Sequence, residues 1–228
     1  LPILIHGLRR LEYRGYDSAG AAILSNGKIS RIKAVGKIDK LEEKIGKQDL
    51  AGTIGIAHTR WATHGGVTEE NAHQHHACTD DLVIVHNGII ENYRELRDEF
   101  LAGHDLKSKT DTEILAHLIE VFYKDNLLKA VQQALARVRG TYGLVVMHAS
   151  EPNKLIAARM GSPLVIGVGD NEYYVASDTS PMLAHTKNVI YLDDGELAEI
   201  TQNGAQIYTL ANKSVSKCVQ KVEWDEIK

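Results

Sequence analysis

Arg60 lies in the segment of the sequence that is most suggestive of chemistry, residues 55–66, which read GIAHTRWATHGG. The small apolar residues at its start predict a buried strand that runs into a polar loop, and loops carried on a rigid sheet are where binding groups concentrate. An arginine guanidinium is a planar fork that binds a carboxylate through two parallel hydrogen bonds, which a lysine cannot do. The segment therefore predicts a binding site for a carboxylate.

Residues 82–92, LVIVHNGIIEN, contain a second apolar strand, which is expected to end at Asn87 and Gly88. An asparagine amide beside a glycine backbone N–H offers two hydrogen-bond donors, which can stabilise the oxyanion of a tetrahedral intermediate in acyl transfer. The same pair is also the strongest short signal for a hairpin turn between two strands. Taken alone, the motif favours the turn, and both interpretations stay open at this point.

A third segment, residues 108–113 (SKTDTE), precedes apolar residues at helical spacing. Thr110 and Glu113 have the spacing of a capping box, and Asp111 in the first turn interacts favourably with the helix dipole. This structural role is sufficient by itself to explain the motif. A carboxylate here is also suited to bind an ammonium group, so Arg60 and Asp111 together would hold both charged ends of an α-amino acid.

The spacing of apolar residues predicts the elements that carry these segments. Strands are expected at 19–24, 29–35, 52–58, 82–87, 143–148, 155–159, 164–168, 173–176, 189–192 and 196–200. Helices are expected at 2–11, 40–46, 91–102, 112–123 and 127–138. Short turns between successive strands favour antiparallel sheets, and two sheets covered by helices form a layered α+β domain.

The 228 residues have an ordinary globular composition, with 43% apolar residues, 25% charged residues and a formal net charge of −4. No linker divides them, so we expect one domain over residues 1–228, whose polar last stretch, 212–228, begins a connection to a further domain. The sequence has no basic tract, apolar run of membrane-spanning length or signal-peptide pattern, so neither nucleic acid nor membrane is an expected partner. Two cysteines give no disulfide framework, which fits a cytoplasmic protein.

Residues 73–78, which read HQHHAC, gather side chains of metal-ligating type: His73, His75, His76 and Cys78. Structural zinc sites usually have two pairs of ligands separated by a loop, with a recognisable spacing. The sequence offers no second half of that kind. We therefore expect surface and pocket-wall histidines here, with no metal and no cofactor.

Taken together, the motifs resemble the class-II glutamine amidotransferases, and more narrowly the glutaminase domains of the glucosamine-6-phosphate synthase family. The matching stretches keep the family's order across nearly the whole chain: 14–20 (RGYDSAG), 58–65 (HTRWATHG), 87–92 (NGIIEN), 110–113 (TDTE), 161–164 (GSPL) and 176–178 (ASD). The octet HTRWATHG is specific, because relatives that aminate other acceptors share the Asn-Gly and acidic elements but lack it. The resemblance implies the four-layer αββα sandwich of the N-terminal-nucleophile hydrolases, with antiparallel sheets.

The resemblance also implies an activity. L-Glutamine would be hydrolysed through a cysteine glutamyl thioester, and the ammonia would pass to a sugar isomerase domain of the same parent chain. The parent enzyme, a homo-oligomer, would make glucosamine 6-phosphate from fructose 6-phosphate and glutamine. The isomerase domain is absent here, so this chain would not complete that synthesis by itself.

Roles for the central residues follow from the resemblance. Arg60 would bind the α-carboxylate of glutamine, and Asp111 would bind its α-ammonium group. Asn87 and Gly88 would form the oxyanion hole.

The resemblance places further residues around these. Thr63 and His64 would line the pocket on a loop that closes over glutamine, and Trp61 on the same loop would gate the passage of ammonia. Arg14 and Gly15 would lie beside the reacting centre.

His73 would lie on the pocket wall. The family usually has proline after that histidine, whereas this chain has Gln74, a substitution that concerns the local loop shape and not the chemistry.

One departure from the family concerns the nucleophile, which in the family is a cysteine at the mature N-terminus with its own α-amino group as general base. This sequence begins LPILI, and apolar residues recur from Leu1 at helical spacing, so we expect the family's first strand and its nucleophile to be missing. The chain as written would then be inactive. Cys78 and Cys218 neither start a strand nor follow a helix N-terminus, and both are expected to be incidental.

Two alternatives stay open. The chain could be a glutamine-binding module that never catalyses, with Arg60 and Asp111 kept for recognition. It could also be the glutaminase domain of another class-II amidotransferase, such as the phosphoribosyl-pyrophosphate-directed enzyme. The residues that precede Leu1 in the expressed protein distinguish the binding module from a catalytic glutaminase domain. The identity of the domain that accompanies the chain distinguishes the phosphoribosyl-pyrophosphate-directed enzyme from the glucosamine-6-phosphate synthase family.

Overall fold

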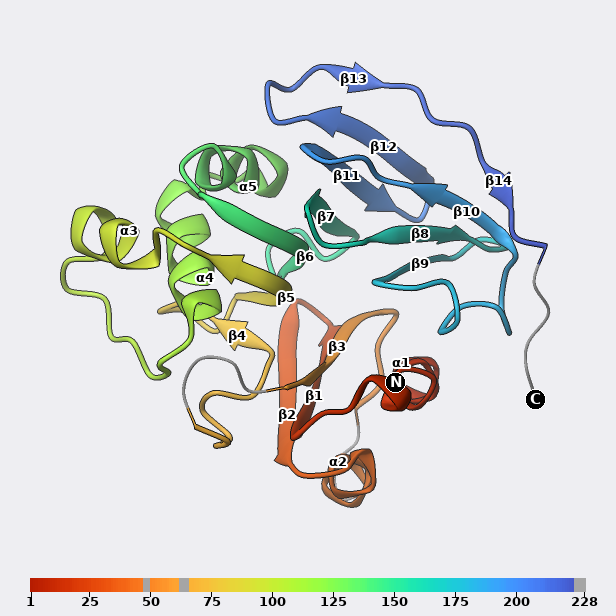
Figure 1. The fold of residues 1–228 in the computed structure, drawn as a ribbon, viewed down its shortest axis with the longest axis horizontal. Helices are drawn as coiled ribbons and strands as arrows, with labels where there is room; N and C mark the ends of the chain where they lie inside the picture. Colours follow the sequence, from red (N-terminus) through yellow and green to blue (C-terminus); the bar gives the residue numbers. More distant parts are fainter. Residues whose placement is uncertain (47–49, 62–65, 224–228) are drawn as a thin grey trace.

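Strands with two apolar faces lie at the centre of the fold. The structure, a computed structural model, describes residues 1–46, 50–61 and 66–223. On β5 (Leu82–Ile90), Leu82 and Ile84 pack against helices, whereas Val83 and Val85 pack against a second layer of strands. Successive side chains of a strand point to opposite faces, so a strand that is apolar on both must be covered on both. The result is a stack of four layers in the order helices, strands, strands, helices (Figure 1).

The first two layers are three helices and a large antiparallel sheet. The helices are α3 (Tyr93–Phe100), α4 (Asp111–Phe122) and α5 (Leu127–Leu135). They cover one face of a seven-stranded sheet with the order β13-β12-β11-β7-β6-β5-β4. Its strands besides β5 are β4 (His75–His76), β6 (Gly140–His148), β7 (Lys154–Met160), β11 (Glu196–Thr201), β12 (Gly204–Thr209) and β13 (Ser214–Val215).

The other two layers are two smaller antiparallel sheets and two helices. One sheet has the order β2-β1-β3 and the other β14-β10-β8-β9. Their strands are β1 (Ser18–Ser25), β2 (Lys28–Val35), β3 (Ile54–Arg60), β8 (Val165–Val168), β9 (Tyr173–Ala176), β10 (Asn188–Tyr191) and β14 (Gln220–Lys221). Helices α1 (Pro2–Arg9) and α2 (Ile38–Ile45) cover the outer face of the three-stranded sheet, and a 3-10 turn, Glu12–Arg14, leads from α1 towards β1.

Helix α4 is the most deeply buried helix of its layer, because its first nine residues are all buried. Thr110 caps it by accepting a hydrogen bond from the Glu113 N–H at 3.3 Å, which confirms one half of the predicted capping box. Glu113 does not return the bond to Thr110. Its carboxylate instead accepts the N–H groups of Lys107 and Ser108, at 2.7 and 2.6 Å.

The elements expected from apolar spacing are confirmed, because each of the expected strands and helices is present with ends that differ by at most three residues. The expectations miss β4, β12, β13 and β14. These strands are short or lie towards the edges of sheets, and main-chain pairing there needs no apolar alternation. The pairing of β13 with β12 and of β14 with β10 also places two parts of the polar stretch after residue 212, 214–215 and 220–221, in the sheets.

None of the helices formed by the described residues has the length and apolar character needed to cross a lipid bilayer.

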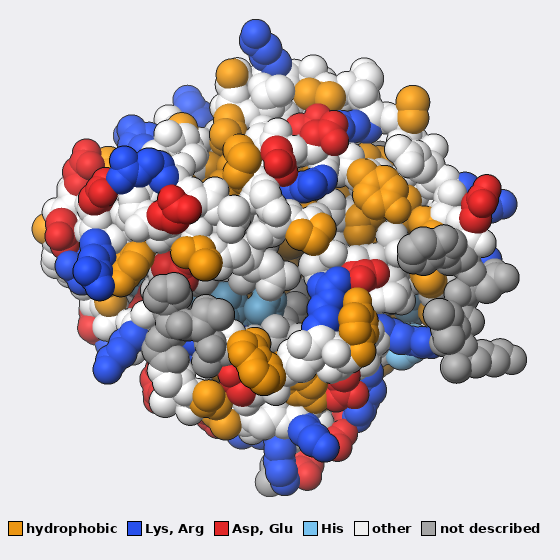
Figure 2. Space-filling model, in the orientation of Figure 1, with side chains coloured by type: hydrophobic (Ala, Val, Ile, Leu, Met, Phe, Trp, Pro, Cys, Tyr) orange, Lys and Arg blue, Asp and Glu red, His pale blue; other side chains and the backbone are white. Residues whose placement is uncertain are grey.

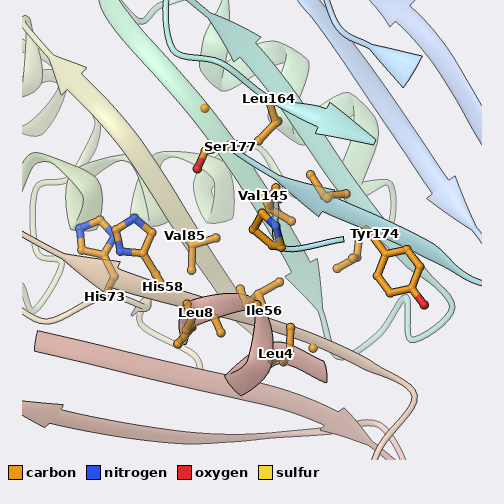
Figure 3. A pocket seen from close by; sticks show the side chains of 18 of the residues that line it. Leu4, Leu8, Ile56, His58, His73, Val85, Val145, Leu164, Tyr174 and Ser177 are labelled. Carbon is orange, nitrogen blue, oxygen red and sulfur yellow. The ribbon is translucent and has the colours of Figure 1, made fainter. Parts of the chain in front are cut away.

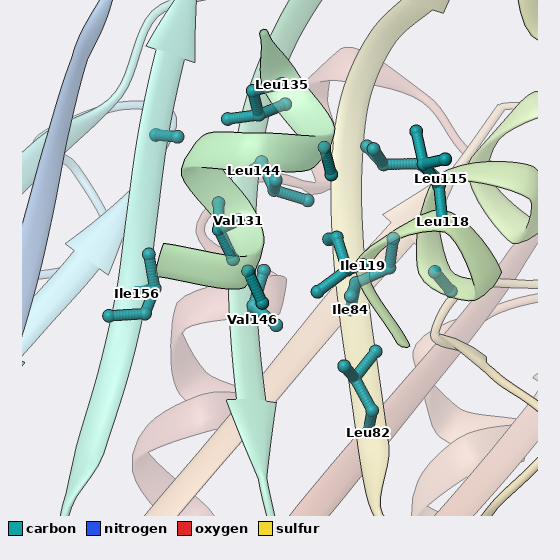
Figure 4. Packing of buried hydrophobic residues seen from close by; sticks show 14 of the residues in the cluster. Leu82, Ile84, Leu115, Leu118, Ile119, Val131, Leu135, Leu144, Val146 and Ile156 are labelled. Atoms are coloured by element: carbon teal, nitrogen blue, oxygen red, sulfur yellow. The ribbon is translucent and has the colours of Figure 1, made fainter. Parts of the chain in front are cut away.

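The packing of β6 against the helix layer leads to a prediction for the free energy of unfolding. Leu144 is fully buried on β6 between β5, β7 and the helix layer (Figure 4). Leu144→Ala should lower the free energy of unfolding by about 2 to 5 kcal/mol, because the cavity it leaves adds to the lost transfer free energy. Urea unfolding at neutral pH measures the change.

The matched control is Val219→Ala, since Val219 is 53% exposed and its truncation removes little buried surface. A Leu144→Ala loss no larger than that of Val219→Ala would contradict the packing described for this layer.

Candidate functional site

A cavity of about 790 Å³ opens between α1, β3, β5, β6 and β9. In the space-filling view it is a hollow with histidine side chains at its bottom (Figure 2). The close view shows that His58 and His73 lie at one end of the cavity, whereas aliphatic side chains of α1, β3, β5 and β6 line much of the remainder (Figure 3). The cavity therefore has a polar end beside a largely aliphatic stretch.

Arg60 is the last residue of β3, and strand alternation puts its side chain on the same face as that of His58. Arg60 is only 5% exposed, yet it lines the cavity, so its guanidinium is presented from inside the protein. Burial lowers its pKa, and the nearby carboxylates of Asp17 and Asp111 act against that shift. Arg60 stays charged, since an arginine side chain in a protein is effectively always protonated.

Asp111 is the first residue of α4, and it joins that helix to the end of β5. Its Oδ2 accepts a hydrogen bond from the Ile90 N–H at 2.7 Å, and its side chain is buried. The carboxylate lines the cavity and acts on both Arg60 and His86 through its charge. A carboxylate and a guanidinium thus face one cavity from two separate elements.

Asn87 lies on β5 and is oriented by His58. The His58 Nε2 and the Asn87 Oδ1 are 2.7 Å apart. With a proton on Nε2, His58 donates to this oxygen, and the amide hydrogens of Asn87 are then the group that remains for a ligand. Both residues line the cavity.

Gly88 has to be a glycine in this fold. Its φ is +140°, and a Cβ at this position would lie 2.1 Å from the Thr141 carbonyl oxygen. Residues 87–90 continue to pair with β6, with Gly88 opposite Tyr142. The expectation that the strand ends at the Asn-Gly pair, and the hairpin turn it would make, are therefore wrong, because the sheet carries β5 three residues further.

Arg14, Gly15 and Trp61 lie together at the cavity rim. Arg14 donates to Ser177 Oγ at 2.9 Å and to Asp178 Oδ2 at 2.7 Å. These two bonds connect the segment that leads into β1 with the segment that follows β9. Gly15 has a φ of +75°, and a Cβ there would come within 3.1 Å of the Trp61 ring. Trp61 is 66% exposed, so its ring lies over Gly15 with much of its surface in solvent.

Eight of the ten predicted site residues line this one cavity: Arg14, Gly15, Arg60, Trp61, His73, Asn87, Gly88 and Asp111. The other two, Thr63 and His64, lie outside the described residues.

The prediction omitted His58 and His86 from the site. His58 stacks on His73 with ring centroids 4.4 Å apart, and His73 meets His75 edge to face. His86 Nδ1 contacts Thr112 Oγ1 at 2.9 Å, which fixes the ring against the first turn of α4. The signal for His58 was present in the sequence, because it stands two positions before Arg60 on the same strand.

These histidines are neutral. Burial lowers the pKa of His58 to about 4 and lowers those of His73 and His86. The Nδ1 atoms of His58 and His73 are enclosed and have no hydrogen-bond partner among the described residues. The polar end of the cavity therefore carries its charge on Arg60 and Asp111.

The histidine-rich run divides between two places. His73 lines the cavity and His75 Nε2 contacts Thr110 Oγ1 at 3.1 Å, whereas Cys78 points to a different cluster outside the cavity. Neither Cys78 nor Cys218 lines the cavity. Burial raises the pKa of the Cys78 thiol, in agreement with the expectation that nothing nearby activates it.

Comparison with known proteins agrees with this geometry. A family model described as a glutamine amidotransferase domain matches residues 58–184. The chain is 46% identical to a glutamine–fructose-6-phosphate aminotransferase (isomerizing) of Chlorobaculum tepidum, over 98% of the chain and 38% of the relative. It is 49% identical to the protein of the same name from Photorhabdus laumondii, over 94% of the chain and 36% of the relative. The chain thus spans less than two fifths of the length of these curated relatives.

Two solved structures share the fold. Glutamine phosphoribosylpyrophosphate amidotransferase from B. subtilis, complexed with ADP and GMP, has a TM-score of 0.80 at 25% identity, over 93% of this chain and 47% of that one. A structure described as the allosteric regulatory enzyme of purine biosynthesis has a TM-score of 0.79 at 27% identity, over 92% of this chain and 46% of that one. The expected αββα sandwich of the N-terminal-nucleophile hydrolase type, with antiparallel sheets, is confirmed.

The enclosed position of His58 predicts a pH dependence of stability. An unfolded histidine has a pKa of about 6.5, so below that pH the unfolded chain binds a proton that folded His58 does not. Stability present at neutral pH is then lost as the pH falls from about 6.5 towards 4. Between pH 7 and pH 4.5 the loss due to this residue should be about 2 to 3 kcal/mol.

His58→Gln isolates this contribution, because glutamine keeps an N–H for Asn87 but does not titrate. Urea unfolding of both proteins at the two pH values gives the difference, which removes the effects of the neighbouring histidines. The wild type should lose more stability on acidification than the variant. Equal losses would mean that His58 takes up its proton without cost in the folded state.

Proposed function

We propose, on the premise that the chain belongs to the family of glutamine amidotransferase domains, that its cavity binds free L-glutamine and supports hydrolysis of the side-chain amide. The observation that carries the proposal is the meeting of Arg60, Asp111 and the Asn87–Gly88 pair in one cavity. These groups come from β3, α4 and β5, and they match the three parts of glutamine: the α-carboxylate, the α-ammonium and the amide.

Arg60 and Asp111 would hold the amino-acid end of the substrate. The guanidinium binds the α-carboxylate through its planar fork, and the carboxylate of Asp111 accepts hydrogen bonds from the α-ammonium group. Both side chains are buried and Asp111 already accepts the Ile90 N–H, so their positions are set before the substrate arrives. Such preorganisation reduces the entropy cost of binding.

Asn87 and Gly88 would form the oxyanion hole. His58 occupies the amide oxygen of Asn87, which leaves the amide N–H as a donor. The positive φ of Gly88 and its close approach to Thr141 exclude any side chain there, so the backbone can approach the reacting carbonyl. Donors fixed at the place where negative charge develops contribute several kcal/mol to the rate.

The remaining predicted residues would surround the reacting amide. Arg14 and Gly15 would border it, and His73 would form the wall behind His58. From its place over Gly15, Trp61 would gate the passage of ammonia towards an acceptor site. Thr63 and His64 would close over the substrate.

The nucleophile would be a cysteine supplied from outside these 228 residues, since neither cysteine of the sequence borders the cavity. Its thiolate would attack the amide carbon, ammonia would leave, and water would hydrolyse the glutamyl thioester to glutamate. The α-amino group of that cysteine would act as the general base.

The acceptor of the ammonia would be fructose 6-phosphate, and the product of the whole enzyme glucosamine 6-phosphate. The relatives that support this acceptor are 46% and 49% identical to the chain, whereas the phosphoribosylpyrophosphate amidotransferase structure is 25% identical. A sugar isomerase domain would supply the second site, in the part of the relatives that this chain does not span.

Arg60→Lys in the intact enzyme tests the carboxylate clamp. A point charge replaces a bidentate fork, so the KM for glutamine should rise about tenfold to a hundredfold, with a smaller change in kcat. Steady-state glutaminase assays measure both. Arg94→Lys, on the exposed face of α3, is the matched control and should leave both constants unchanged. An unaltered KM in Arg60→Lys would show that Arg60 does not bind the substrate carboxylate.

Asn87→Ala tests the oxyanion hole. Loss of one preorganised donor should lower the glutaminase kcat on the order of 100-fold, whereas glutamine binding measured by calorimetry should persist. Asn188→Ala, at an exposed position on β10, controls for the loss of an asparagine. Near-normal turnover would show that Asn87 has another role. An intact wild-type protein that binds glutamine without turning it over would establish the non-catalytic alternative instead.

A further inference from the structure

A cluster of metal-ligating side chains lies outside the cavity and has no part in the proposed function. Cys78 comes from the loop after β4, His104 from the loop after α3, and His117 from the middle of α4. Among the described residues these side chains and Glu120 place one potential ligand atom each within 4.8 Å of one another. None of the four lines the glutamine cavity.

The geometry points to a binding site for a divalent zinc-class cation, held by Cys78 Sγ, His104 Nδ1 and His117 Nδ1, with water in the fourth position. We infer that the bound ion is structural and ties two loops to α4. Thiolate and imidazole are the ligands that zinc prefers, and three protein ligands with one water are a known zinc arrangement.

The distances between the three atoms suit a tetrahedral ion. Sγ lies 3.3 Å from His104 Nδ1 and 3.5 Å from His117 Nδ1, and the two nitrogens are 2.9 Å apart. An ion with Zn–S of about 2.3 Å and Zn–N of about 2.0 Å needs sulfur and nitrogen roughly 3.5 Å apart and the nitrogens roughly 3.3 Å apart. Movements of less than about half an ångström would complete the site.

The surroundings of His117 favour this binding mode. With Nδ1 directed at the ion, the ring proton lies on Nε2, which faces Glu113 Oε1 at 3.9 Å in a region where both side chains are almost fully buried. Metal-bound histidines usually direct the other ring N–H to such a carboxylate. Glu113 is itself held by Ser108 Oγ at 2.8 Å and by two backbone N–H groups.

Glu120 positions the cysteine. Its Oε2 accepts the Cys78 N–H at 3.1 Å, and its Oε1 accepts the N–H and hydroxyl of Thr79 at 2.9 and 2.8 Å. Because these three donors already bond to the Glu120 carboxylate, we place water, and not Glu120, in the fourth position of the ion. Cys78 is exposed, so an ion and its water reach the site from solvent.

Binding releases one proton for each ion. The metal-free side chain is a neutral S–H at neutral pH, since a free cysteine thiol has a pKa of about 8.5. The cation displaces that proton to solvent and bonds to the resulting thiolate, while the ring proton shared between the two Nδ1 atoms moves to an Nε2. Without metal, the same three atoms form a chain of hydrogen bonds, which is the competing interpretation.

Metal titration of the full chain, purified without a polyhistidine tag and stripped with a chelator, tests the site. Zinc measured by equilibrium dialysis should bind one ion per chain, and cobalt should give thiolate charge-transfer absorption with the visible bands of a tetrahedral complex. Cys78→Ser and His104→Ala should each weaken zinc binding at least tenfold, and Cys78→Ser should abolish the charge-transfer absorption.

Cys218→Ser is the matched control, because it removes the other exposed cysteine of the sequence and should keep both signals. Zinc should also raise the midpoint of thermal unfolding of the wild type and of Cys218→Ser, but not of Cys78→Ser. Both cluster variants change side chains that reach solvent, and circular dichroism confirms their folding.

The inference is overturned if the wild type binds no stoichiometric zinc, if Cys78→Ser binds it as tightly as Cys218→Ser, or if the cobalt complex lacks thiolate absorption. Any of these results would leave the hydrogen-bonded triad as the whole description of the cluster. The measurements contain no glutamine, so their outcome is independent of the proposed glutaminase activity.

Discussion

The hydrogen bond from the Ile90 N–H to the Asp111 carboxylate is the interaction on which the site depends. It joins the last residue of β5 to the first residue of α4, so the carboxylate is held at the end of the strand that carries the Asn87–Gly88 pair. A buried carboxylate is costly unless it is hydrogen-bonded, and this backbone donor reduces the cost. Because β3 faces the same cavity, the bond also fixes where a negative charge stands relative to Arg60.

Burial strengthens the interactions that the charges of Arg60 and Asp111 can make with a ligand. Arg60 and Asp111 are both almost inaccessible to solvent, and charges interact more strongly where water is excluded. The histidines around them are kept neutral by the same burial, so they add shape and hydrogen bonds without adding positive charge beside the guanidinium. An enclosed polar end of this kind can distinguish an amino acid by its charged groups, whereas the aliphatic stretch of the cavity offers little to bind those groups.

The sequence was a sound guide to the elements, which depend on local rules, and eight of the ten residues that it proposed for a site line one cavity. Apolar residues mark the buried strands, and Arg60 and Asp111 stand where β3 ends and α4 begins, whereas Asn87 stands within β5. Local rules failed where pairing partners decide the outcome. The Asn-Gly pair has the composition of a turn, but its pairing with β6 keeps it in the strand.

The sequence by itself determined the periodicity of the layers and the chemical types available at the ends of the strands. Only the tertiary structure decided which of those side chains meet. His58 orients Asn87 from 29 residues away, and Cys78 faces His104 and His117 instead of the histidines beside it in the chain. Contacts of this range depend on how sheets and helices stack, and residue spacing along the chain carries no record of that stacking.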